Sequence, residues 1–79
     1  LVQVFPNPFG ERFAVSLPAG WLPQQARLWL YDGLGRRVLS QRLRAGANAV
    51  PAGHLPPGVY FYVVVESGVV VAQGRVAKG

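Results

Sequence analysis

The sequence predicts an all-β protein, because three observations indicate strands joined by tight turns. The first is Gly58–Glu66, the longest run of β-branched and aromatic residues in the chain. The second is the alternation of apolar residues with others in segments 12–17 and 26–31. The third is the recurrence of proline and glycine turn signals about every 8–12 residues, with no helical period. This pattern is typical of an immunoglobulin-like β-sandwich of about seven short antiparallel strands, with a small barrel as the alternative.

Three strands are predicted in the first part of the chain. The one before Pro6 is expected to end at Phe5 and to lie at a sheet edge, because proline cannot donate to a strand ladder. In the next two strands the alternating apolar residues are expected to face the core. They are Phe13, Val15, Leu17, Ala26, Leu28 and Leu30. The other face of segment 26–31 carries Arg27, Trp29 and Tyr31.

Two hairpins are predicted from their turn residues. In Asp32-Gly33-Leu34-Gly35 the carboxylate can accept hydrogen bonds from the amides that follow, and glycine can adopt positive φ. Segment 36–43 is therefore expected to pair back onto segment 26–31. Ser67-Gly68 is expected to join Gly58–Glu66 to the apolar run that begins at Val69.

The strand Gly58–Glu66 is expected to be central. Both of its alternating faces are apolar or aromatic, which is best explained by cover on both sides or by packing under long loops. Leu55-Pro56-Pro57 leads into it in an extended or turning path. A short strand is also expected at Ala49-Val50.

Composition limits the functional classes. Seventy-nine residues form one domain, 1–79, and no apolar run approaches the roughly 20 residues that a membrane-inserted helix needs. Without cysteine there is neither a disulfide framework nor a thiolate metal site. The net charge of +5 is typical of proteins that bind nucleic acid or an anionic surface. For the arginines of segment 36–44, however, we favour a solvated strand face over a binding patch. Because the chain begins at Leu1, we expect it to be part of a longer protein with a signal peptide upstream.

Catalytic and metal chemistry are not expected. His54 is the only histidine and has no acidic residue at ligand-like spacing. The chain has three acidic residues and no threonine, and its serines have no nearby base. The glycines of the Gly33-Leu34-Gly35 turn lack the third glycine of a dinucleotide fingerprint, since position 38 is valine. We therefore expect no enzyme, no cofactor and no metal.

An aromatic platform is the alternative function. Trp29 and Tyr31 share one strand face and could stack on a sugar, as in a carbohydrate-binding or adhesion module of a secreted multidomain enzyme. A nucleic-acid module is disfavoured, because the arginines are not interleaved with aromatic residues in a recognition strand.

Four segments resemble the C-terminal sorting domain of the type IX secretion system, in the family's order and over nearly the whole chain. Phe5-Pro6-Asn7-Pro8-Phe9 is similar to the family's Tyr-Pro-Asn-Pro opening, with Phe5 in place of tyrosine. Leu30-Tyr31-Asp32-Gly33-Leu34-Gly35-Arg36 resembles its Tyr-Asp-x-x-Gly-Arg/Lys turn. Leu55-Pro56-Pro57-Gly58-Val59-Tyr60 is similar to its Leu-x-x-Gly-x-Tyr step. Gly74-Arg75-Val76-Ala77-Lys78 resembles its closing strand, with Arg75 where lysine is common and Ala77 where a larger aliphatic residue is usual.

The resemblance implies a non-catalytic sorting signal at the C-terminus of a secreted protein from the Bacteroidota. It implies passage of the N-terminal cargo through the periplasm and across the outer membrane by the type IX translocon. It also implies cleavage by a sortase-like peptidase and attachment to the cell surface. Our hypothesis is that the chain end and the nearby turn are recognised, through Gly74, Arg75, Val76, Lys78, Gly79, Asp32, Gly35 and Arg36. The motif residues with an expected structural role are Pro6, Asn7, Pro8, Phe9, Gly58 and Tyr60.

Overall fold

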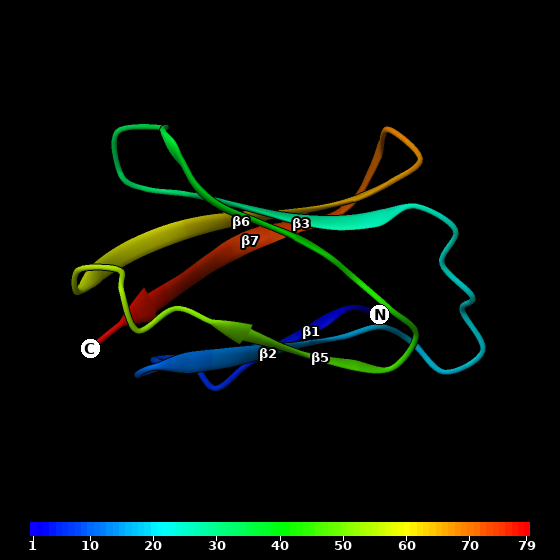
Figure 1. Ribbon diagram of the computed structural model, residues 1–79, viewed down its shortest axis with the longest axis horizontal. Helices are drawn as coiled ribbons and strands as arrows, with labels where there is room; N and C mark the ends of the chain where they lie inside the picture. Colours follow the sequence, from blue (N-terminus) through cyan, green and yellow to red (C-terminus); the bar gives the residue numbers. More distant parts are fainter.

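Two antiparallel sheets form the two layers of the protein (Figure 1). The computed structural model describes all 79 residues. Its strands are β1 (Gln3–Phe5), β2 (Arg12–Ser16), β3 (Ala26–Tyr31), β4 (Arg37–Arg42), β5 (Ala47–Pro51), β6 (Gly58–Glu66) and β7 (Val69–Lys78). One sheet has the order β1-β2-β5 and the other the order β4-β3-β6-β7. The fold is therefore the predicted all-β sandwich of seven antiparallel strands.

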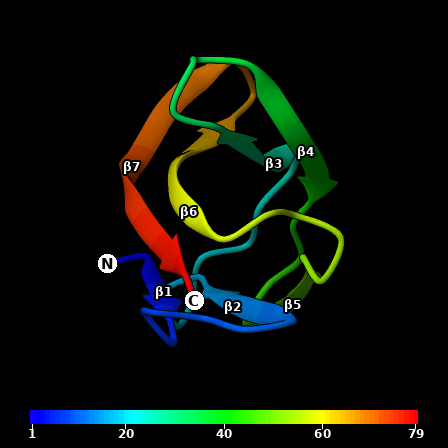
Figure 2. The same ribbon diagram turned by 90° about the vertical axis from the view of Figure 1, so that its left-hand side faces the viewer.

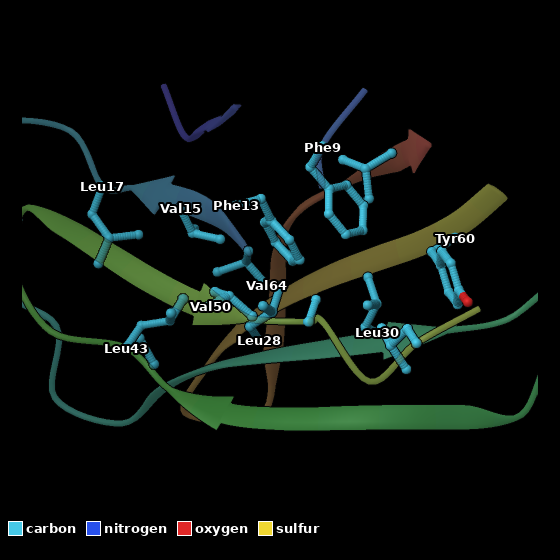
Figure 3. Packing of buried hydrophobic residues seen from close by; sticks show 14 residues of the cluster. Phe9, Phe13, Val15, Leu17, Leu28, Leu30, Leu43, Val50, Tyr60 and Val64 are labelled. Carbon is cyan, nitrogen blue, oxygen red and sulfur yellow. The ribbon is translucent and has the colours of Figure 1, made fainter. Parts of the chain in front are cut away.

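The core fills the space between the two sheets (Figure 3). All six residues that the alternation placed inward in the first three strands are buried. From the second half of the chain, Val50, Tyr60, Val64 and Val76 join them. Period-2 alternation identified the first six because successive side chains of a strand point to opposite faces of its sheet.

The strand β6 is central, as predicted, because it pairs with β3 on one side and β7 on the other. Its inner face is buried at Tyr60 and Val64, but its outer face is open, with Val59 49% and Phe61 45% exposed. The expectation that both faces would be covered is wrong. Covering the outer face would need a third layer, and this chain builds only two.

The predicted connections are present. β1 ends at Phe5 and is an edge strand of its sheet. Both hairpins form, β3 with β4 and β6 with β7, and Ser67-Gly68 turns the second one. The short strand expected at residues 49–50 extends over Ala47–Pro51. The protein contains no helix long and apolar enough to cross a membrane.

Candidate functional site at one end of the sandwich

The four motif segments meet at one end of the sandwich. Tyr31 pairs with Phe61, and Gly58 pairs with Lys78, so the β3–β4 turn, the loop before β6 and the end of β7 lie together. The β1–β2 connection reaches the same end, at the left of Figure 1 and facing the viewer in Figure 2. We call this surface the motif end and define it by residues 6–11, 32–36, 52–57 and 75–79.

The first motif is hydrogen bonded to the last strand. Asn7 Oδ1 accepts a bond of 3.0 Å from the Ala77 amide. The Phe9 amide donates to the Ala77 carbonyl at 2.9 Å, and the Gly79 amide donates to the Phe9 carbonyl at 3.1 Å. The Phe9 ring is buried, with its centroid 4.9 Å from that of Phe13. The motif thus anchors itself in the core and fixes the end of β7, which would otherwise be a free edge.

Lys78 connects the chain end to the loop before β6. Its Nζ donates to the carbonyl oxygens of Ala52 at 3.0 Å, Gly53 at 3.1 Å and Leu55 at 2.6 Å. An ammonium group has three N–H donors, and all three have an acceptor here. The side chain predicted to be a recognition cation therefore points back into its own fold.

The third motif shapes the start of β6. Gly58 has a φ of +152°, in the region that favours glycine. Two residues later the Tyr60 hydroxyl donates to the Pro56 carbonyl, and the ring of Tyr60 is buried. This bond holds the loop 52–57 against the strand that follows it, and the same loop supplies the acceptors of Lys78.

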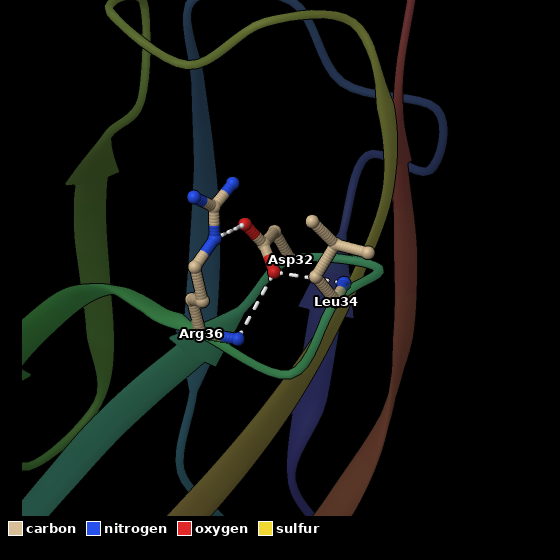
Figure 4. A network of polar contacts seen from close by, with 3 residues as sticks. All are labelled: Asp32, Leu34 and Arg36. Carbon is tan, nitrogen blue, oxygen red and sulfur yellow. Dashed lines mark hydrogen bonds and ion pairs between the residues drawn. The ribbon is translucent and has the colours of Figure 1, made fainter.

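Asp32 organises the β3–β4 turn (Figure 4). Its Oδ1 accepts bonds from the amides of Leu34 at 2.9 Å and Arg36 at 3.0 Å, and its Oδ2 accepts one from Arg36 Nε at 2.9 Å. These bonds, that from the Arg36 amide above all, lower the pKa of the carboxyl below its ordinary value. Gly35 adopts a φ of +81° and donates to the Asp32 carbonyl. The predicted role of Asp32 as an acceptor within the turn is confirmed, and the turn presents Arg36 to solvent with its side chain 72% exposed.

The predicted recognition residues of β7 occupy different environments. Val76 is only 2% exposed and belongs to the core. Gly74 lies against Tyr62, because a Cβ atom at position 74 would be 2.7 Å from the Tyr62 hydroxyl oxygen. Arg75 and Gly79 are exposed. The side chains of this set that the surface displays are therefore those of Arg75 and Arg36.

The residues of the alternative function lie on another surface. Trp29 and Tyr31 share the outer face of the four-stranded sheet, as predicted. The guanidinium carbon of Arg37 lies 4.9 Å from the centroid of the Trp29 ring, in cation–π geometry. One face of the tryptophan is thus occupied by the protein itself. His54 is exposed in its loop, and no group of three or more acidic or histidine residues could hold a metal ion.

The sequence analysis did not identify Asn48, the one buried polar residue of the fold. Its two Nδ2 hydrogens are shared among the carbonyls of Val15, Arg44 and Gly46, and its Oδ1 accepts from the Arg44 amide at 2.8 Å. The signal was an asparagine at an inward position of an alternating strand, two residues after Gly46. Such a residue needs internal partners, since an unpaired buried amide is unfavourable.

Most of the chain matches a known protein family by sequence. No curated protein sequence matches the chain. Residues 3–76 match the sequence profile of a family described as the secretion system C-terminal sorting domain. The match includes the first three motifs and the fourth as far as Val76.

Proposed function

The chain belongs to the family of secretion system C-terminal sorting domains, the sorting signals of type IX secretion, and from this premise we propose how it is recognised. Such a domain interacts with the secretion system and belongs to an exported protein. The family is in general non-catalytic. We propose that residues 1–79 work as one unit and that the motif end is the surface the translocon contacts.

The observation that supports this proposal is the meeting of four motifs at one end of the sandwich, although the chain separates them by up to 70 residues. Hydrogen bonds that involve Asn7 as acceptor, the Phe9 backbone and the Lys78 ammonium group hold the last residues in place. A surface that is already ordered loses little conformational entropy when it binds. In this proposal Arg36, Arg75 and the backbone at Gly79 make the contacts, whereas Val76 and Lys78 keep the chain end in position.

The route of the cargo follows from the resemblance. We propose that N-terminal cargo domains of the same protein reach the periplasm first and that the translocon then carries them across the outer membrane. A sortase-like peptidase would remove the domain upstream of its first strand and attach the cargo to the cell surface. In this proposal the domain's own role is to be recognised by the translocon, through the exposed side chains of Arg36 and Arg75.

The experiment is an export assay. A reporter with a signal peptide is fused upstream of residues 1–79 in a host with type IX secretion, and the secreted fraction is measured with and without the domain. We expect export only with the domain, and lower export for Arg75→Glu and Arg36→Gln. Arg44→Glu is the matched control, since Arg44 is exposed in the loop after β4, at the other end of the sandwich.

Two results would contradict the proposal at different levels. Periplasmic retention of the unaltered fusion would show that the domain is not a sufficient sorting signal. Normal export of both motif-end variants would place recognition elsewhere on the domain. Point substitutions are preferable to deletion of residues 75–79, because that deletion removes Val76 from the core and the Lys78 contacts from the loop.

A further inference from the structure

No third layer covers the outer face of the four-stranded sheet, and Val65 is the one residue of its rows that is buried. Cross-strand pairing places its side chains in rows, since directly paired residues share a face. The rows are Arg37-Tyr31-Phe61-Arg75, then Ser40-Trp29-Val63-Gln73, then Arg42-Arg27-Val65. We call this surface the outer face. Its centre is aromatic and aliphatic, and arginines lie at both ends.

The charge on the outer face has one sign. It carries four arginines, which are half of the eight cationic residues of the chain: Arg27, Arg37, Arg42 and Arg75. None of the three carboxylates lies on it. Asp32 is bonded within its turn, Glu66 accepts from the amides of Gln24 and Gln25, and Glu11 precedes β2 in the other sheet. The arginines therefore have no acidic partner on this surface.

Two features of the outer face do not favour the isolated fold. Arg27 and Arg42 are directly opposite each other on β3 and β4, an arrangement of like charges that destabilises a sheet. Phe61 and Val59 leave nearly half of their surfaces in water in the first half of the central strand β6. Aromatic residues together with arginines are enriched in protein interfaces and supply most of their binding energy.

We propose that the outer face is a second docking surface, which binds an acidic protein surface of the export machinery. Carboxylates of the partner would pair with the arginines at the two ends, and apolar side chains would cover Phe61 and Val59. This inference rests on the proposed sorting function and adds a partner surface that shares only Arg75 with the motif end.

Other occupants fit less well. A second copy of this chain would bring another +5 of charge and the same arginines against the face. A nucleic acid or an anionic polysaccharide would satisfy the arginines but offers little aliphatic surface for Val59 and Val63. Carboxylates around an apolar contact match both parts of the outer face.

The test uses a substitution that should improve the fold while damaging the surface. Arg27→Glu replaces the like-charged pair with Arg42 by an opposite-charged one, so the urea midpoint of unfolding should stay the same or rise. Export of the reporter fusion should nevertheless fall at least about tenfold, because a carboxylate would then face the acidic partner. Phe61→Ala should also reduce export. Arg44→Glu changes net charge equally outside the sheet and should be exported like the unaltered chain.

Each outcome decides a separate point. Export of Arg27→Glu at the unaltered level would overturn the second docking surface while leaving the sorting function standing. An equal loss with Arg44→Glu would show that only net charge matters and would also overturn it. Retention of the unaltered chain, but not of Arg27→Glu, on single-stranded DNA or on lipopolysaccharide vesicles at about 150 mM salt would replace the protein partner by a polyanion. Failure of the unaltered fusion to be exported would refute the sorting function, and this inference with it.

Discussion

Replacing Lys78 by methionine tests the contact that closes the motif end. Methionine keeps an unbranched apolar side chain of similar length but removes the ammonium group. Three hydrogen bonds to the loop before β6 are then lost. The Ala52 carbonyl keeps the Leu55 amide as a donor, whereas no other donor reaches the Leu55 carbonyl.

The size of the effect follows from these contacts. Hydrogen bonds to a charged group contribute about 1.5–3 kcal/mol net, and ordering a lysine side chain opposes this by up to about 2 kcal/mol. An acceptor left without its donor adds about 1–3 kcal/mol. We therefore expect Lys78→Met to lower the free energy of unfolding by about 2 kcal/mol. A chain of this size has a total of about 4–12 kcal/mol, and its Tm should fall by about 8–16 °C.

The assay is equilibrium urea unfolding followed by the fluorescence of Trp21 and Trp29, with thermal unfolding by circular dichroism. The matched control is Arg75→Met, which removes a cation from the same strand. The side chain of Arg75 is exposed and makes no hydrogen bond within the protein. It should change stability by less than about 0.5 kcal/mol. If Lys78→Met unfolds within 0.5 kcal/mol of the unaltered chain, or if both variants lose the same amount, the closing contact has no stabilising role and our reasoning is refuted.

Three further predictions concern single contacts. Gly74→Ala should lower the free energy of unfolding by about 1–3 kcal/mol, because the new Cβ atom would lie 2.7 Å from the Tyr62 hydroxyl oxygen. Calorimetry should show that most of this destabilisation disappears when Tyr62→Ala is present as well. Asn48→Ala should lower the urea-derived free energy of unfolding by about 2–3 kcal/mol, since it removes the two N–H donors shared by three carbonyls and the acceptor of the Arg44 amide. An unchanged urea midpoint would contradict this. Hydrogen bonds lower the pKa of Asp32 and, chiefly through the Gln25 amide, that of Glu66. Their stabilisation should be complete above about pH 5 and lost as pH falls below about 4, and urea midpoints of the D32N/E66Q variant should show a smaller acid-dependent loss.

The contacts of the motif end show where sequence reasoning succeeds. Asp32 was predicted to bind the amides that follow it, and it does so within four residues. Phe13 and Leu28 were assigned to the core from alternation alone. Both inferences depend on neighbours in the chain, where backbone geometry leaves few arrangements.

Other predictions depended on residues that are distant in the chain. Lys78 was interpreted as a free cation, because nothing near it in sequence suggests that three carbonyls more than 20 residues away converge on it. Phe61 was expected to be covered by another part of the protein. The expectation failed because a run of apolar residues does not show how many layers the fold contains. The like-charged pair of Arg27 and Arg42 became visible only with the register of β3 and β4.

Local spacing along the chain was enough to predict the strands, their inward faces, the two hairpins and the family to which the protein belongs. The folded arrangement was needed to show that the four motifs share one end, that Lys78 and Val76 support that end, and that an arginine-rich outer face has no third layer over it. These properties come from hydrogen bonds and strand pairing between segments up to 70 residues apart. Such pairings follow from how the two sheets pack together, and no local pattern encodes them.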